Sequence, residues 1–271
     1  MDKSIYTKNY LPVLEQFAEE TKGFFDKGYH EGVFIPYAFD GYWDADFKVF
    51  YIGQDTAYWL TDEINEPFQY GNELFMEHRD NNTLSEYLRL NSECVTPGRL
   101  VNGSMKSDGG FWNFIQKLHI RLCTGEYKSP LSQLSLEERM LINSAGYGEA
   151  FCVELPKSLE NEYGTPDECW EDNDWESYQI VSTAARKIAD IRLLLETFSP
   201  DLVVITTGQE DIALSDLEIV EAFRDEMMTA FTVRGFNTKF IWTYHPRRLR
   251  SRFGGDENTI ERIAMAFEIW P

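Results

Sequence analysis

The stretch Lys48-Val49-Phe50-Tyr51-Ile52-Gly53-Gln54-Asp55-Thr56 decides the predicted fold. Residues 48–52 are rich in β-branched and aromatic types and lead directly into a glycine, which predicts a buried strand that ends in a tight turn. In open α/β sheets, ligands bind beyond the carboxyl ends of the strands. We therefore expect Gln54 and Asp55, which follow the glycine, to lie at a ligand site.

Further apolar runs of the same character predict more strands, at residues 150–155, 201–208 and 239–244. Amphipathic patterns predict helices over residues 6–25, 111–122, 135–144, 178–198, 216–233 and 257–269. Strands that alternate with helices and are apolar on both sides are typical of a parallel sheet covered on both faces. The sequence therefore predicts one three-layer α/β/α domain over residues 1–271, with the helix and arm of residues 1–45 packed on it.

Composition restricts the classes of partner. The chain has 25 basic and 46 acidic residues and a formal net charge of −21, which argues against strong non-specific binding to nucleic acid or to an anionic membrane. The cysteines are widely spaced without a Cys-x-x-Cys pair, so neither a metal site nor a cofactor is predicted. No window approaches the roughly 18 apolar residues of a membrane span. These features favour a cytoplasmic protein that does not bind membranes.

Polar groups follow each predicted strand. They are Gln54 and Asp55, Glu154 and Lys157, residues 206–209, and His245. Because parallel strands end at one edge of a sheet, we expect these groups to face one cleft, where a carboxylate and a histidine can do acid/base or electrostatic work. Structural roles are the alternative: Asp55 capping the following turn, and His245 beginning a helix.

Several motifs resemble those of the uracil-DNA glycosylase superfamily, and they occur in the same order. Gly53-Gln54-Asp55 is similar to the start of the first motif of the classical branch, and Thr243-Tyr244-His245-Pro246 is similar to the final motif. Residues 66–71, Glu-Pro-Phe-Gln-Tyr-Gly, resemble the Arg-Pro-Phe-Val-Gly segment of the iron–sulfur branch, and residues 154–157 fall where that branch has Asn-Val-Val-Lys. The resemblance implies a glycosylase-like fold with a four-stranded parallel sheet in the order 2-1-3-4, numbered along the chain.

The resemblance also implies roles in DNA repair chemistry for individual residues. Asp55 would position or activate a water molecule, or stabilise the positive charge that develops on the sugar. Gln54 would hold the base through its backbone, and Phe68 would stack on the base. His245 would donate a hydrogen bond to the base oxygen as the leaving group gains negative charge. Enzymes of this kind extrude the base from the stack into a pocket.

The chain departs from the family pattern at several positions. Residues 56–58, Thr-Ala-Tyr, replace Pro-Tyr-His, and the cysteines that bind the iron–sulfur cluster are not matched. Glu154, which precedes Lys157 in the substrate-binding segment, stands where an asparagine would recognise uracil. An ionised glutamate accepts hydrogen bonds but cannot donate them, so it would repel the uracil 4-oxygen and suit a base with an exocyclic amine; the alternative is a protonated Glu154.

Four arginines follow the final motif in a very acidic chain. They are Arg247, Arg248, Arg250 and Arg252. One hypothesis is a phosphate-binding patch beside the pocket, formed above all by the first three, through which the protein would contact DNA. The other hypothesis is internal salt bridging to the abundant carboxylates.

The sequence supports one leading functional hypothesis and two rivals. The leading hypothesis is a hydrolase that cleaves an N-glycosidic bond in DNA or in a nucleoside-like substrate. The first rival is a non-catalytic protein of the same fold that binds a protein or a nucleotide partner. The second rival is an acidic mimic of nucleic acid that competes for a DNA-binding partner.

Overall fold

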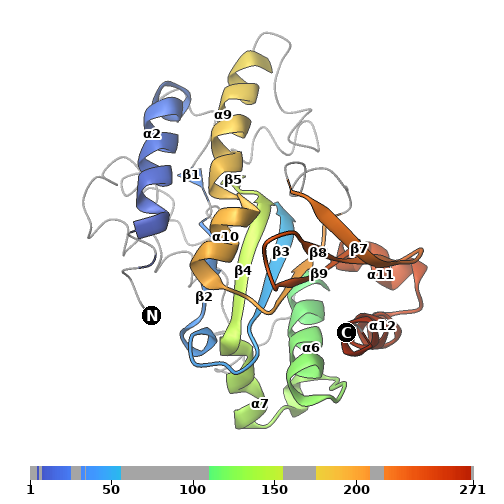
Figure 1. The fold of residues 1–271 in the computed structure, drawn as a ribbon. Helices are drawn as coiled ribbons and strands as arrows, with labels where there is room; N and C mark the ends of the chain where they lie inside the picture. The colour runs from blue at the N-terminus through green and yellow to red at the C-terminus, as the bar shows by residue number, and fades with distance from the viewer. Residues whose placement is uncertain are drawn as a thin grey trace.

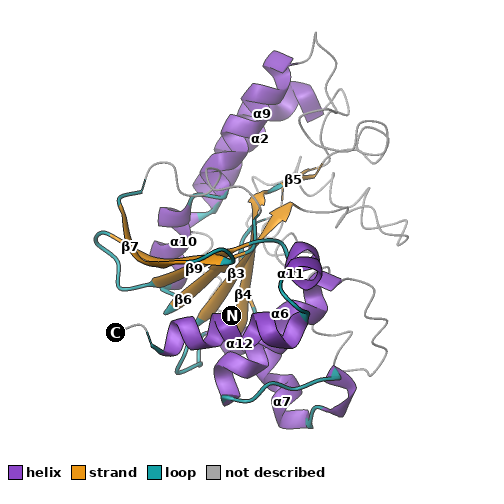
Figure 2. Ribbon diagram, turned by 90° about the vertical axis from the view of Figure 1, so that its right-hand side faces the viewer, coloured by secondary structure: helices purple, strands orange, loops and turns teal. Residues whose placement is uncertain are grey.

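The computed structural model describes residues 5, 8–25, 32–33, 35–55, 110–154, 175–207 and 217–269. This part is an α/β structure with helices on both faces of a mixed sheet (Figures 1 and 2). The helices are α2 (Leu11–Phe25), α6 (Gly110–Thr124), α7 (Leu136–Leu141), α9 (Trp175–Ile188), α10 (Ile191–Phe198), α11 (Pro246–Arg252) and α12 (Asp256–Glu268). The strands are β1 (Gly32–Val33), β2 (Tyr37–Ala38), β3 (Val49–Asp55), β4 (Ala145–Phe151), β5 (Val153–Glu154), β6 (Leu202–Ile205), β7 (Ile219–Arg224), β8 (Met228–Val233) and β9 (Lys239–Thr243).

The main sheet has seven strands in the order β2-β4-β3-β6-β9-β8-β7, and β1 pairs with β5 in a separate small sheet. Strands β4, β3, β6 and β9 are parallel neighbours, so the predicted order 2-1-3-4 is confirmed for these strands and β3 lies in the interior of the sheet. The expectation of a four-stranded, purely parallel sheet is wrong. Strands β2, β8 and β7 extend it with antiparallel pairs.

The predicted helix over residues 216–233 is also wrong, because this segment forms the β7–β8 hairpin. Its apolar residues suit a helix by spacing, but the sequence from Met228 onward is rich in β-formers and is largely buried between β7 and β9. The hairpin turns at Asp225, whose carboxylate oxygen Oδ1 accepts hydrogen bonds from the backbone N–H groups of Met227 (2.7 Å) and Met228 (2.8 Å).

Two other boundaries differ from the sequence expectation. The predicted helix over residues 178–198 is two helices, α9 and α10, because Asp190 caps the second one by accepting from the backbone N–H of Arg192. The second predicted strand, residues 150–155, begins earlier: β4 covers residues 145–151, and only Val153 and Glu154 continue as β5. This shift adds Tyr147 and Glu149 to the sheet.

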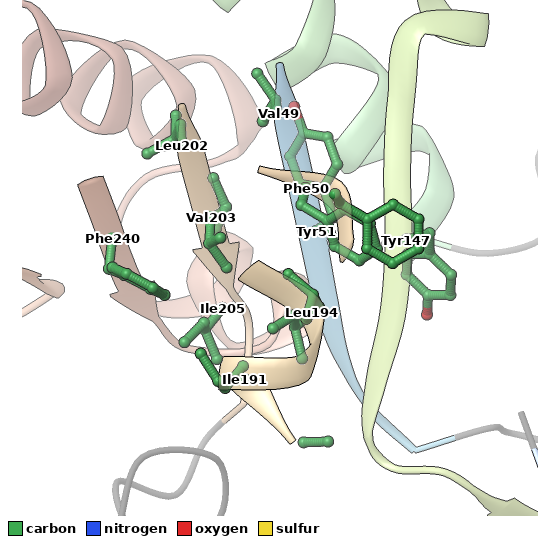
Figure 3. Packing of buried hydrophobic residues seen from close by; sticks show 14 of the residues in the cluster. Val49, Phe50, Tyr51, Tyr147, Ile191, Leu194, Leu202, Val203, Ile205 and Phe240 are labelled. Atoms are coloured by element: carbon green, nitrogen blue, oxygen red, sulfur yellow. The ribbon is translucent and has the colours of Figure 1, made fainter. Parts of the chain in front are cut away.

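The face of the sheet that α10 covers is packed with buried hydrophobic side chains (Figure 3). The rings of Phe50 and Phe198 lie 4.8 Å apart between centroids. Phe50 also lies over β4 at Gly146, where a Cβ atom would overlap its ring. A large side chain on β3 thus requires a glycine on β4, and together they bring strand and helix into close contact.

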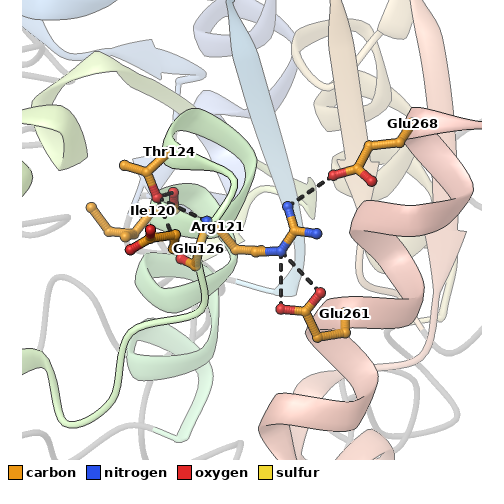
Figure 4. Close-up of polar contacts among 6 residues, drawn as sticks. All are labelled: Ile120, Arg121, Thr124, Glu126, Glu261 and Glu268. Carbon is orange, nitrogen blue, oxygen red and sulfur yellow. Dashed lines mark hydrogen bonds and ion pairs between the residues drawn. The ribbon is translucent and has the colours of Figure 1, made fainter.

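Ion pairs join the helices on the opposite face. The guanidinium of Arg121 on α6 contacts Glu261 and Glu268 of α12, each at 2.9 Å (Figure 4). The Arg121 side chain is only 9% exposed, so its charge needs these partners. The pairing holds α12 against α6, which begins beside the carboxyl edge of the sheet.

Candidate functional site

The carboxyl edge of the parallel strands brings two of the predicted site residues to one side of the sheet. Asp55 is the last residue of β3, and His245 comes two residues after the end of β9. The two strands run parallel with β6 between them. Gln54 lies within β3, which continues to Asp55, and it is exposed. The predicted cleft also required Phe68, which lies outside the described residues, as does Lys157.

Glu154 lies in a different sheet from β3 and β9, the strands that lead to Asp55 and His245. It belongs to β5, and its partner in the pairing is Gly32 of β1. Asp55, by contrast, pairs with Phe151 at the end of β4. The backbone therefore leaves the main sheet between residues 151 and 153.

His245 is held at the start of α11 in one defined orientation. Its Nδ1 accepts a hydrogen bond from the backbone N–H of Arg247 at 3.2 Å, which caps the helix. Its ring stacks on Phe111 of α6, with centroids 5.6 Å apart and planes 18° apart. The α11 capping role agrees with the structural alternative for this residue, a histidine that begins a helix.

Partial burial and two arginines keep the His245 ring neutral. Burial lowers the pKa of the imidazole, and the charges of Arg247 and Arg250 lower this pKa further. Because Nδ1 accepts a hydrogen bond, the single proton of the neutral ring is on Nε2. Nε2 makes no hydrogen bond to any residue that the structure describes. The site therefore offers an uncharged N–H donor at the end of β9.

A buried pair, Tyr147 and Glu149, lies beside the glycine of the first motif. The Tyr147 hydroxyl donates a hydrogen bond to Oε1 of Glu149, and the two residues are 4% and 5% exposed. Gly53 pairs with Glu149 across β3 and β4. A Cβ atom at Gly53 would lie 2.6 Å from the Tyr147 hydroxyl and closer still to the Glu149 carboxylate. Gly53 lies inside β3, so the predicted tight turn at this glycine is wrong; a glycine is required here because the Tyr147–Glu149 pair occupies the space that a side chain would fill.

The sequence interpretation missed this pair because it placed the second strand too late. A phenylalanine links the pair to the histidine: Phe111 contacts Tyr147 edge to face, at 5.9 Å between centroids, and stacks on His245. The signal in the sequence was the alternation of glycine with large polar residues over residues 146–149. Glycine is depleted in strands, so this alternation argued against a strand there.

The arginines after the final motif divide into two groups. Arg250 forms an ion pair with Asp256, so internal salt bridging describes this residue. Arg248 lies over the ring of Tyr244 at 4.3 Å, and Arg252 lies over Phe253 at 5.4 Å. Within the described ranges, no carboxylate pairs with Arg247, Arg248 or Arg252. These three cations can meet an external anion.

A small hollow of about 60 Å³ lies between the ends of β6 and β9 and the β7–β8 turn. Trp242 and Thr207 both line it, and the indole N–H of Trp242 donates a hydrogen bond to the carbonyl oxygen of Thr207 at 3.0 Å. Ligand pockets usually measure roughly 300 Å³ or more. The hollow therefore has room for water but not for a nucleobase.

The described residues contain no group of three or more His, Cys, Asp or Glu side chains placed to hold a metal ion. Burial raises the pKa of the Cys123 thiol to about 11 and that of Cys152 to about 12, so neither thiol is a nucleophile at neutral pH. Among the described helices, none has the length and apolar character needed to cross a membrane.

The fold and the site together define an α/β protein with a polar site at the carboxyl edge of a mixed sheet. The chain matches no protein-family model and no curated protein sequence.

Proposed function

We propose that the protein is a hydrolase of the uracil-DNA glycosylase type, which cleaves an N-glycosidic bond in DNA or in a nucleoside-like substrate. The observation that carries the proposal is the orientation of His245. It is neutral, its Nδ1 is occupied by the protein, and its Nε2–H is available at the same sheet edge as Asp55. The strand order β4-β3-β6-β9 agrees with the motif resemblance.

The reaction requires stabilisation of opposite charges at the two ends of the scissile bond. Glycosidic cleavage passes through an oxocarbenium-like state, with positive charge on the sugar and negative charge on the departing base. The Asp55 carboxylate would stabilise the sugar cation or orient the attacking water. The His245 Nε2–H would donate to the base oxygen as its charge grows. A neutral donor placed in advance is worth most in the transition state, where the charge is largest.

Contact with a nucleic acid would come from α11, next to the histidine. Arg247, Arg248 and Arg252 supply the cations, and Tyr244 supplies an aromatic face. Arg250 is removed from the predicted phosphate-binding set because Asp256 occupies it. This local positive surface allows a substrate phosphate to approach a chain whose net charge is −21.

The net charge favours a second candidate, a non-catalytic protein of the same fold that binds a protein or a nucleotide. DNA repels a uniformly acidic surface, and the repulsion weakens as salt is added. Binding to DNA through α11 predicts the opposite dependence, with affinity that falls as salt rises. A salt series with a fluorescent oligonucleotide therefore separates the two candidates.

The direct test is base release from single- and double-stranded oligonucleotides that contain uracil, hypoxanthine, xanthine or an alkylated base. We expect release of at least one base, and a loss of roughly 100-fold or more with Asp55→Asn or His245→Gln. Asp44→Asn, at an exposed position outside the site, is the matched control and should keep full activity. A Glu154→Gln variant tests whether this residue disfavours uracil. No release from any oligonucleotide would leave the non-catalytic candidate.

A further inference from the structure

Two contacts join α6 to α11, and His245 takes part in one of them. The first contact is the stacking of its ring on Phe111. The second is a cluster of Asp256, Arg250 and Lys117, which we call the Asp256 cluster. In it, Oδ2 of Asp256 accepts from Nζ of Lys117 at 3.1 Å and from the guanidinium of Arg250 at 3.0 Å, while Oδ1 faces Nε of Arg250.

The Asp256 cluster is more than a surface ion pair. The side chains of Asp256 and Lys117 are 14% and 11% exposed. Burial alone would raise the pKa of Asp256, but the hydrogen bonds from Arg250 and Lys117 lower it below its usual value. The carboxylate is therefore ionised at neutral pH and bound to both helices at once. Shielding from water makes the attraction within such pairs stronger than within exposed ones.

The two contacts are separated along both helices. Lys117 follows Phe111 by six residues on α6, a rise of about 9 Å, and Arg250 follows His245 by five residues, a rise of about 7.5 Å. The buried side chains of Pro246 and Leu249 hold α11 on the core, and a single contact with α6 would constrain its direction less. Two separated contacts fix both the position and the direction of the helix, and with them the plane of the imidazole.

We propose that Asp256 is a positioning residue for His245. It binds α11 to α6 through Arg250 and Lys117, and so keeps the imidazole stacked on Phe111 with Nε2 directed away from the α11 backbone. Its consequence for catalysis rests on the proposed function, whereas its effect on the ring position does not.

The electrostatic surroundings of His245 are consistent with this role. On α11 the charged groups that face the imidazole are Arg247 and Arg250. From α6 the imidazole meets Phe111, which is uncharged. From α12, Asp256 reaches it only through Arg250. Asp256 therefore also compensates the charge of Arg250, one of the two cations that disfavour protonation of the ring.

The test measures the position of the ring directly, by the NMR shifts of the His245 ring protons in the full chain. Stacking on Phe111 displaces these shifts, and Phe111→Leu gives the value without stacking. We expect Asp256→Asn to move the shifts toward the Phe111→Leu value. The matched control is Glu261→Gln, which also breaks an ion pair between α6 and α12, at 2.9 Å from Arg121, but does not involve α11. It should leave the shifts unchanged.

Two further variants keep the proposal open to refutation if Asp256→Asn folds poorly. Lys117→Met removes only the α6 side of the cluster and should move the shifts in the same direction by a smaller amount. Asp256→Glu keeps the charge and should restore part of the wild-type shifts. Wild-type shifts in folded Asp256→Asn or Lys117→Met would overturn the proposal, as would equal changes in Glu261→Gln.

Measurements of activity provide a second test, separate from the NMR measurement. If the protein releases a base, Asp256→Asn should lower kcat about tenfold with little change in KM, because the donor is displaced rather than removed. If no base is released while the ring shifts move as expected, the glycosylase proposal fails and the positioning role of Asp256 stands. If a base is released while the ring shifts stay unchanged, the glycosylase proposal stands and the positioning role of Asp256 fails.

Discussion

Two histidines on the same side of the sheet both have lowered pKa values, but their hydrogen bonds differ. His119 on α6 is 1% exposed, and both of its nitrogens are bound within the protein. Its Nε2–H donates to the carbonyl oxygen of Leu141 at 3.0 Å and lies 3.0 Å from Oγ of Ser144, while Nδ1 accepts from the Tyr51 hydroxyl at 3.0 Å. His245 is half-buried, and in the part of the chain that the structure describes only its Nδ1 is hydrogen-bonded.

The hydrogen bonds of the two rings give a criterion that distinguishes a structural histidine from one that can bind a ligand. Low pKa alone does not distinguish them, because burial lowers the pKa of His119 to about 4 and also lowers the pKa of His245. The distinguishing feature is the second nitrogen. A structural histidine satisfies both nitrogens inside the protein, whereas a functional one keeps a donor for a ligand.

The largest effect that we expect concerns stability. His119→Leu keeps the volume but leaves the buried Tyr51 hydroxyl without its acceptor, so it should lower the free energy of unfolding by about 3 kcal/mol. Urea denaturation measures this change. His245→Gln, measured alongside, should cost about 1 kcal/mol or less. A His119→Leu variant as stable as wild type would mean that the histidine network does not stabilise the fold.

The second expectation is a pH dependence that belongs to His119. Its folded pKa of about 4 lies below the ordinary value of 6.5, so between these values the unfolded chain binds more protons than the folded one. Stability should therefore fall by about 3 kcal/mol as the pH is lowered from 6.5 to 4, and be regained above pH 6.5. Denaturation of wild type and His119→Leu across this range isolates the contribution. Parallel curves for the two proteins would contradict it.

The third expectation concerns activity without loss of the fold. On an oligonucleotide from which wild type releases a base, His245→Gln should lower kcat roughly 100-fold, equivalent to about 2.7 kcal/mol. The circular dichroism spectrum should stay unchanged. Glutamine keeps a side-chain amide but cannot reproduce the planar ring on Phe111. If both His119→Leu and His245→Gln lost activity only in proportion to lost folding, the contrast between the two residues would disappear.

The smallest effect that we expect is that of a substitution at Phe111. Phe111→Leu removes the ring that stacks on His245, at a cost of about 1 kcal/mol in stability. It also exposes the imidazole, so the pKa of His245 should rise toward its ordinary value. An NMR titration measures the change, with the pKa of His119 as the internal reference. A lower His245 pKa in this variant would show that burial is not the main cause of the shift.

The central strands could be predicted from the sequence, while the edge of the sheet could not. Residues of β3, β6 and β9 form short apolar runs because both faces are covered, and such runs are recognisable. Every residue of β7 is exposed, so no inside–outside alternation marks it as a strand. Periodicity then favours a helix over the same residues. Only the Asp225 turn, a local feature, distinguishes the hairpin.

The candidate site was predicted only in part for a similar reason. His245 follows an apolar strand and precedes a proline, so its place at the edge could be inferred from neighbouring residues. Glu149 is different, because its position depends on Gly53, nearly 100 residues earlier in the chain. The cluster of Asp256, Arg250 and Lys117 likewise depends on three helices meeting. Such side-chain contacts follow from packing, which single-sequence patterns do not contain.

The arrangement of strands also has a consequence for the order of folding. Strands β7, β8 and β9 follow one another through short turns, so they can pair as local hairpins, which close within about 1–10 μs. Strand β3 instead pairs with segments about 100 and about 150 residues away, and such long loops close late. We therefore expect β3 to join β6 after the C-terminal hairpins exist. The strand that ends in Gly53-Gln54-Asp55 would then become native late, together with β4, which joins the parallel set only through β3.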